Sequence, residues 1–101
     1  MDDCVWIHYA RARPHWYELP EAERALLRRA WNEIASRSRA GGGQQLGCWH
    51  VRGQSDFSTV EIWRFATVDD AFDHWTRLAA AGYSQWFAFG NSVGMPTDLE
   101  L

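Results

Sequence analysis

From position 59 to 65, β-branched and aromatic residues fall at alternating positions on both faces of an extended segment. Apolar residues then recur at intervals of three to four from 71 to 79. The first pattern is typical of a β-strand and the second of an amphipathic helix. Between them Thr67 stands three residues before Asp70, which is the spacing of a helix N-cap. Gly82 follows the last apolar position and indicates where the helix ends. This stretch therefore predicts a strand, a capped turn and a helix in direct succession.

The same patterns continue on both sides of this stretch. Alternation predicts strands over 4–10, 45–52, 57–65 and 85–93. A helix is predicted from position 20 or 21, where Pro20 suits the first turn, and the stripe of Leu27, Ala30, Trp31 and Ile34 would bury one of its faces. Pro14 predicts a loop over 11–20, and the glycine run 41–43 ends the helix with the segment that we expect to be most mobile.

The predicted order βαββαβ is that of the ferredoxin-like fold, an α+β arrangement in which two helices cover one face of an antiparallel four-stranded sheet. A chain of 101 residues has the length of one domain. We expect a single domain over 1–101, with an ordered core from about 4 to 94 and a short tail over 95–101.

The hydrophobic and aromatic content of the chain predicts that it binds a second copy of itself. The chain is 47% hydrophobic and 15% aromatic and contains seven tryptophans, which is much apolar surface for so small a body. The second face of the predicted sheet has no helices to cover it. We therefore expect a homodimer that buries this face against its own copy.

Charge removes two classes of partner. The formal net charge is −3 and all ten basic residues are arginines, so the basic excess typical of nucleic-acid and membrane-surface binding is missing. No apolar run approaches the roughly 18 residues of a membrane span, and the acidic start lacks the pattern of a signal peptide. These features predict a soluble, cytoplasmic protein, in which Cys4 and Cys48 would stay reduced.

The segment EIWRF, followed by Asp69, Asp70, Ala71, Phe72 and His74, resembles the strand-to-helix signature of the dimeric α/β-barrel superfamily. That superfamily includes small antibiotic-biosynthesis monooxygenases, stress-responsive barrel proteins, and EthD-like and NIPSNAP-like domains. The resemblance covers most of the chain as architecture. It implies a planar substrate held in an aromatic cavity between the sheet and the helices.

Histidines are the first candidates for chemistry, because imidazole titrates near neutral pH and can take or give a proton. His8 and His50 each lie on a predicted strand beside a tryptophan and could face that cavity. The alternative is that each is a hydrogen-bonded structural histidine or part of a dimer interface. His74 lies at the edge of the helical stripe four residues after Asp70, which predicts a pair between them, and His15 is expected on the surface.

Metal and cofactor sites are expected to be absent. Cys4 and His8 on one strand and Cys48 and His50 on another could suggest zinc, but the third strand is expected between these two and would hold the pairs about 10 Å apart, too far for one ion. Haem is a minor possibility, since one axial histidine can suffice. The haem-degrading branch of the superfamily has a tryptophan where this chain has Ala66 and a histidine where it has residues near Gln85.

Other candidates could hold or orient a substrate. Arg52 and Arg64 end predicted strands and could stabilise an enolate or phenolate, whereas exposed strand-end charge is the simpler explanation of both. Glu61 lies inside a covered strand, where a carboxylate must be paired or protonated, and an arginine is the expected partner. The tryptophans expected to line a flat pocket are Trp6, Trp49, Trp63 and Trp86.

These residues support one functional hypothesis and its alternatives. The first is a cofactor-independent monooxygenase or cyclase acting on an aromatic or polyketide-like small molecule. His8 or His50 would be its base, Arg52 or Arg64 would hold the anion, and the tryptophans would orient the ring. The alternatives are a non-catalytic dimer that binds a hydrophobic ligand or haem, and a stress-type structural protein without a pocket.

Overall fold

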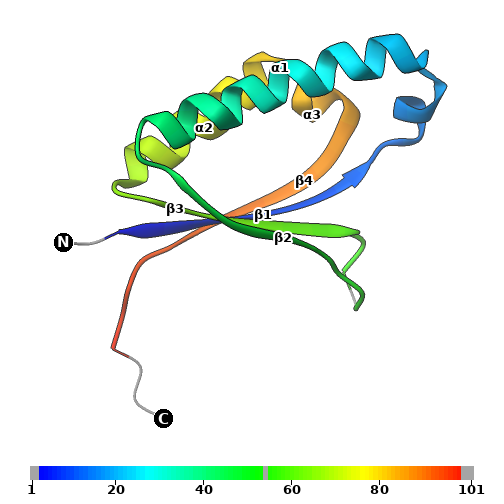
Figure 1. The fold of residues 1–101 in the computed structure, drawn as a ribbon. Helices are drawn as coiled ribbons and strands as arrows, with labels where there is room; N and C mark the ends of the chain where they lie inside the picture. Colours follow the sequence, from blue (N-terminus) through cyan, green and yellow to red (C-terminus); the bar gives the residue numbers. More distant parts are fainter. Residues whose placement is uncertain (1–2, 54, 99–101) are drawn as a thin grey trace.

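The computed structural model describes residues 3–53 and 55–98 and has the ferredoxin-like order that the sequence predicts. Three helices lie on one side of a four-stranded sheet, and the other side is open (Figure 1). The elements are β1 (Cys4–Ala12), the 3-10 helix η1 (Pro14–Glu18), α1 (Glu21–Ala40), β2 (Gln44–His50), β3 (Thr59–Phe65), α2 (Val68–Ala80), α3 (Tyr83–Trp86) and β4 (Phe87–Gly94). The strand order is β2-β3-β1-β4 with every neighbouring pair antiparallel, so the fold class is confirmed.

The segments before and after the helices differ from the prediction. β1 runs on to Ala12, and the loop expected over 11–20 contains η1, which Pro14 opens. The fourth strand begins at Phe87, because residues 83–86 form the one-turn helix α3 after Gly82. Of the tail expected over 95–101, residues 95–98 form neither helix nor strand, and residues 99–101 lie outside the described part.

Local signals set the helix ends. The Oγ1 of Thr67 accepts a hydrogen bond from the backbone N–H of Asp70 at 3.1 Å, which is the predicted N-cap of α2. Gly82 adopts a left-handed backbone with φ 84°, a conformation that glycine reaches at little cost, and so the chain turns from α2 into α3.

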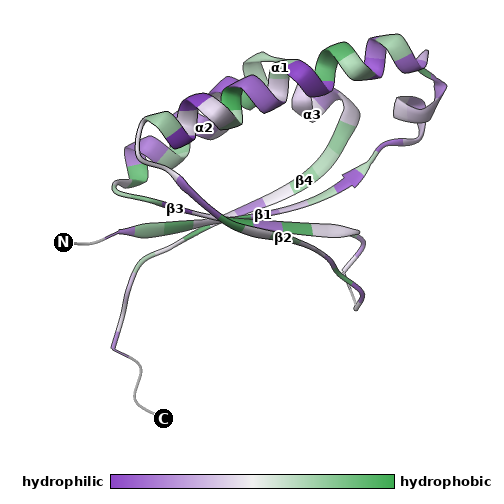
Figure 2. Ribbon diagram, in the orientation of Figure 1, coloured by the Kyte–Doolittle hydropathy of each residue, from purple (hydrophilic) through white to green (hydrophobic). Residues whose placement is uncertain are grey.

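The core lies between the helices and the sheet. Trp6 and Trp63 are fully buried opposite each other on β1 and β3, and Trp31 of α1 and Leu78 of α2 pack onto the same cluster. Hydrophilic residues follow much of α1, whereas the strands carry apolar segments (Figure 2). No helix in the described part of the chain is long and apolar enough to span a bilayer.

The register assigns each strand residue to one of the two sheet faces. His8 stands opposite Glu61 on β3 and Asn91 on β4, on the face that the helices cover. Ile7 stands opposite Ile62 on the open face, and both side chains are half-buried. The positions that matter for a site between sheet and helices are therefore those that share a face with His8.

Candidate functional site

A cavity of about 320 Å³ lies between α1, α2 and the helix-covered face of the sheet. This volume falls at the lower end of the roughly 300–1,000 Å³ of small-molecule pockets. Its apolar walls are Trp31, Ala35 and Leu78, and its polar walls are His8, Asn32, Arg39, Gln45, Glu61, His74 and Tyr83. Seven of these ten residues carry polar side chains, and polar groups that converge on one space can fix the orientation of a bound ligand.

His8 is held at both ring nitrogens. Its Nδ1 lies 2.6 Å from the Oδ1 of Asn91 and its Nε2 lies 2.8 Å from the hydroxyl oxygen of Tyr83. Because a carboxamide oxygen can only accept, Nδ1 carries the proton, and the Tyr83 hydroxyl donates to the lone pair of Nε2. Burial lowers the pKa of His8 despite the opposing effects of Asn91 and of the charge on Glu61. The imidazole is therefore neutral at pH 7.

Tyr83 begins α3 and closes the cavity beside His8. Its ring stacks on Phe87, with centroids 5.1 Å apart, and meets Trp31 edge-on. Burial raises the pKa of its hydroxyl, and the charge on Glu61 adds to that effect. The phenol thus keeps its proton, which it donates to His8.

His74 is the second imidazole on the cavity wall and corrects a prediction. We expected it at the helix edge, paired with Asp70, but it is 2% exposed and its Nδ1 lies 2.5 Å from the Oγ of Ser38 on α1. The reason is helical geometry, because His74 shares the inner face of α2 with Ala71 and Leu78, three and four residues away. Burial lowers the pKa of His74 to about 4, and nearby positive charge adds to this effect.

The carboxylate of Glu61 accepts hydrogen bonds from side chains other than arginine. Its Oε2 accepts hydrogen bonds from the indole N–H of Trp63 at 2.6 Å and from the side-chain amide of Gln45 at 2.8 Å. The Oε1 of Gln45 in turn accepts from Arg39 at 2.9 Å. The expected direct pairing of Glu61 with an arginine is therefore wrong for the described residues, because Gln45 stands between Glu61 and Arg39.

Two of the predicted tryptophans lie beneath the cavity. The ring of Trp6 stacks on His8, with centroids 4.8 Å apart and planes at 17°. Trp63 packs against His74 with centroids 4.7 Å apart. These indoles support the two imidazoles and are not themselves part of the cavity wall.

The remaining predicted residues lie elsewhere. His50 and Arg52 border a separate hollow of about 480 Å³ with Phe57. The indole of Trp49 lies on the open face over Gly47, and Trp86 in α3 packs against His15.

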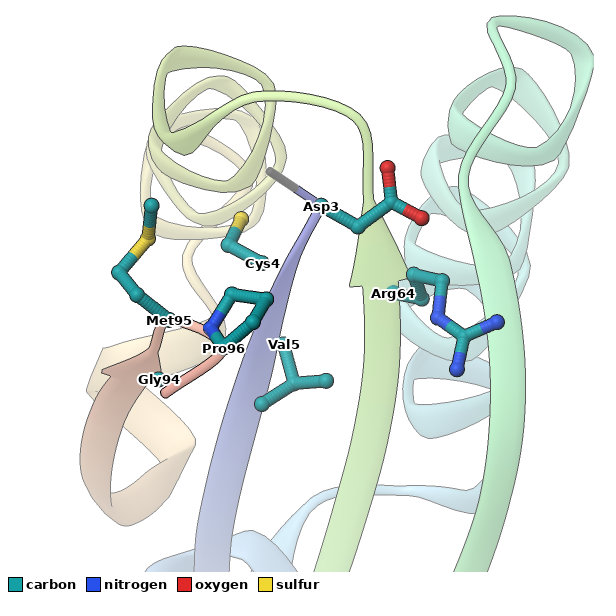
Figure 3. A pocket seen from close by; sticks show the side chains of 7 residues that line it. All are labelled: Asp3, Cys4, Val5, Arg64, Gly94, Met95 and Pro96. Carbon is teal, nitrogen blue, oxygen red and sulfur yellow. The ribbon is translucent and has the colours of Figure 1, made fainter. Parts of the chain in front are cut away.

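Arg64 borders a third hollow, of about 380 Å³, at the end of the sheet. Figure 3 shows its side chain there with those of Asp3, Cys4 and Val5. None of the residues lining this hollow or the hollow of His50 lines the cavity of His8. The structure therefore brings His8 and Glu61 together and leaves His50, Arg52 and Arg64 apart from them.

The hydrogen-bond partners of the two imidazoles were among the site residues that the sequence interpretation missed. Tyr83 and Asn91 reach His8 from positions 75 and 83 residues away, and Ser38 reaches His74 across 36 residues. Asn91 was recognisable as a polar residue on an alternating strand, but its register against β1 was not. A strand residue that faces helices while carrying an amide is the signal that could have drawn attention to it.

Solved structures resemble this chain in fold, whereas no family model and no curated protein matches it. A mutant chlorite dismutase from Candidatus Nitrospira defluvii is 13% identical with a TM-score of 0.80 over 97% of this chain and 41% of that chain. The same enzyme in complex with imidazole is 13% identical with a TM-score of 0.75, over 94% and 40%. A protein from Thermus thermophilus, described as a novel heme-binding protein, is 14% identical with a TM-score of 0.74, also over 94% and 40%.

The heme-binding protein corrects the prediction that no cofactor is used. That prediction rested on Ala66 and on the residues near Gln85, where one haem-degrading branch has other residues. A protein described as heme-binding nevertheless shares this fold over 94% of the chain. The structure also places a different histidine, His8, at a cavity wall, so two positions of one branch were too narrow a test. This chain spans about two fifths of the length of these matched chains, and at such low identity what it shares with them is the ferredoxin-like fold.

Proposed function

We propose that this chain binds a planar, largely apolar small molecule in the cavity between α1, α2 and the sheet. The observation that carries the proposal is the cavity itself, about 320 Å³, with two neutral imidazoles and a phenol on an aromatic wall. Buried polar groups are costly, so a core needs few of them. Their concentration around one space favours a ligand site, and the volume suits a ligand of two or three fused rings.

Haem is the specific cofactor to test at the His8 end of this cavity, although it is larger than two or three fused rings and would have to extend past the rim. The donor chemistry fits, because the bond from Nδ1–H of His8 to Asn91 leaves the lone pair on Nε2, the tautomer in which a histidine binds a metal. His8 would hold the iron and Asn91 would orient the ring, once the Tyr83 hydroxyl releases Nε2. Haem would supply redox or gas-binding chemistry when bound. The heme-binding protein of the same fold supports this choice.

A titration of the purified protein with hemin tests both statements. Binding is expected to shift the Soret band and to quench tryptophan fluorescence, since Trp31 lines the cavity. The variant His8→Ala is expected to lose the shift, whereas His50→Ala, which lies at another hollow, keeps it. An identical Soret band in the folded His8→Ala protein would exclude His8 as the iron ligand. No response to hemin or to any two- or three-ring aromatic would overturn the ligand proposal.

Oxygenation or ring closure of an aromatic or polyketide-like ligand is the finer proposal for the same cavity. His8 supports it, because a neutral imidazole can take a proton from a phenol or an activated carbon. Arg39 is the guanidinium on this cavity wall, so it rather than Arg52 or Arg64 is the group that we propose to hold the anion. Oxygen uptake or ring closure with hydroxylated polycyclic probes should fall at least tenfold in Arg39→Gln. Equal losses in Arg52→Gln would count against the assignment to this cavity.

A second copy of the chain is the partner that we propose for the open face of the sheet. Val5, Ile7 and Ile62 lie half-buried on that face, and Trp49 is 49% exposed. An apolar face of this kind is stabilised by burial, and the same patch on two copies can pack by two-fold symmetry. Sedimentation of the protein at micromolar concentration is expected to give twice the mass of the chain.

A further inference from the structure

We propose that the His8 end of the cavity selects ligands that carry a hydrogen-bond donor, a hydroxyl or N–H group on the ring, over ligands that only accept. This inference deepens the proposed function and rests on it. It follows from which atoms of His8, Tyr83 and Glu61 donate hydrogen bonds and which accept them. The ligand class it names comprises phenols, enols and ring N–H compounds, as opposed to their methyl ethers and quinones.

Asn91 sets the direction of the hydrogen bonds that His8 makes. Its Oδ1 lies 2.6 Å from Nδ1 of His8 and can only accept, so the single proton of the neutral imidazole is on Nδ1. Nε2 then has a lone pair, and the Tyr83 oxygen 2.8 Å away must donate to it. A phenol has one proton, and Tyr83 has used it. Toward the cavity, the Tyr83 oxygen can therefore only accept a hydrogen bond.

Glu61 is a second hydrogen-bond acceptor on the same cavity wall. Glu61 stands directly opposite His8 across β1 and β3 and lines the same cavity. Its Oε2 accepts hydrogen bonds from Trp63 and Gln45. One of the two N–H protons of the Gln45 amide is therefore engaged with Glu61.

The side-chain donors that could serve a ligand at the rim lie on the exposed residues Asn32, Arg39 and Gln45. The cavity thus offers acceptors at its His8 end and donors at its edge. A ring hydroxyl pointed inward would be matched, whereas an ether or carbonyl oxygen in the same place would face other acceptors. A site built to bind a hydroxyl in this way discriminates against the analogue that lacks it, because buried polar groups are then left unpaired.

A matched pair of probes, 2-naphthol and 2-methoxynaphthalene, tests the selection by fluorescence titration. The naphthol is expected to bind about tenfold more tightly, the effect of one hydrogen bond. Tyr83→Phe should keep the preference, because the lone pair of Nε2 is then itself presented to the ligand. Asn91→Leu should weaken it, because the imidazole is free to change tautomer. Tyr17→Phe, at an exposed tyrosine, is the matched control and should change nothing.

The tautomer is read independently in the unliganded protein by ¹⁵N NMR of the histidine side chains. A protonated Nδ1 in His8 is expected. A protonated Nε2, or a preference for the ether in Tyr83→Phe, would overturn the inference. Equal binding of both probes would overturn the selection while leaving the binding proposal standing. Failure of both probes to bind would overturn the two together.

Discussion

The Nδ1 of His74 on α2 lies 2.5 Å from the Oγ of Ser38 on α1, and Trp63 and Phe65 pack around the imidazole. This pair joins the two long helices at the wall of the cavity. Together with the hydrogen bond from the indole N–H of Trp31 on α1 to the backbone oxygen of Ala81 at the end of α2, the polar pair specifies how the two helices align. Its energetic consequence is a dependence of stability on pH.

Stability is expected to fall as the pH drops from about 6.5 to about 4. In this range the unfolded chain binds a proton at position 74, since the reference pKa is 6.5, whereas the folded chain stays neutral until its pKa of about 4. The contribution is complete above pH 6.5 and is lost progressively below it, up to about 3 kcal/mol. Urea denaturation of the wild type and of His74→Leu at several pH values measures it.

The variant His74→Leu should show a flatter profile over that range, whatever its absolute stability. His15→Gln, at an exposed histidine, is the control and should follow the wild type. Parallel profiles for the wild type and His74→Leu would show that the imidazole of His74 titrates as it does in the unfolded chain. His8, whose pKa burial also lowers, adds a slope of the same sign in every variant that keeps it.

The cap of α2 predicts a second measurable loss. Thr67→Ala removes the oxygen that accepts from Asp70 N–H and should cost about 1 kcal/mol in free energy of unfolding. Thr76→Ala, at an exposed position inside α2, is the matched control and should be neutral or slightly stabilising, since alanine is the better helix former. If the two substitutions change the thermal unfolding temperature equally, the Thr67 cap does not stabilise α2.

Gly43 is expected to tolerate no side chain. A Cβ there would stand 2.9 Å from the backbone oxygen of Ser38 and 2.9 Å from Cε1 of Phe65, and the backbone oxygen cannot move freely. Gly43→Ala should therefore destabilise the fold by about 1–3 kcal/mol. Gly53→Ala, where nothing lies within 4 Å, should have little effect. The urea midpoints of the two variants give the comparison, and a stable Gly43→Ala would show that β2 can shift.

The open face makes a prediction about assembly. Ile7→Glu places a charge at the centre of that face, opposite Ile62, and should convert the proposed dimer to a monomer because an unpaired charge is costly to bury. Ala25→Glu adds the same charge on the exposed side of α1 and should leave the mass unchanged. Sedimentation equilibrium distinguishes them, with circular dichroism to show that both variants fold. A dimer that survives Ile7→Glu must use another surface.

Short-range patterns were sufficient for the four strands, the two long helices and their order, but not for the short helices η1 and α3. The Thr67 cap, the glycine at position 82 and the stripe that includes Ala71 and Leu78 act within a few residues, so they can be recognised in the sequence. The strand order with β3 beside β1 followed from the topology that these elements imply. The open face also followed, because two helices can cover only one side of the sheet.

The sequence by itself therefore determined the fold class and singled out two residues of the cavity wall, His8 on the same face as Trp6 and Glu61 on the same face as Trp63. Only the tertiary structure decided what His8 touches, since Asn91 and Tyr83 come from elements more than 70 residues away and their register is set by packing. The same reason moved His74 from the helix edge to the core, where Ser38 is its partner. Helical and strand periodicity give the face on which a side chain lies, whereas its hydrogen-bond partner depends on which distant element is packed against that face.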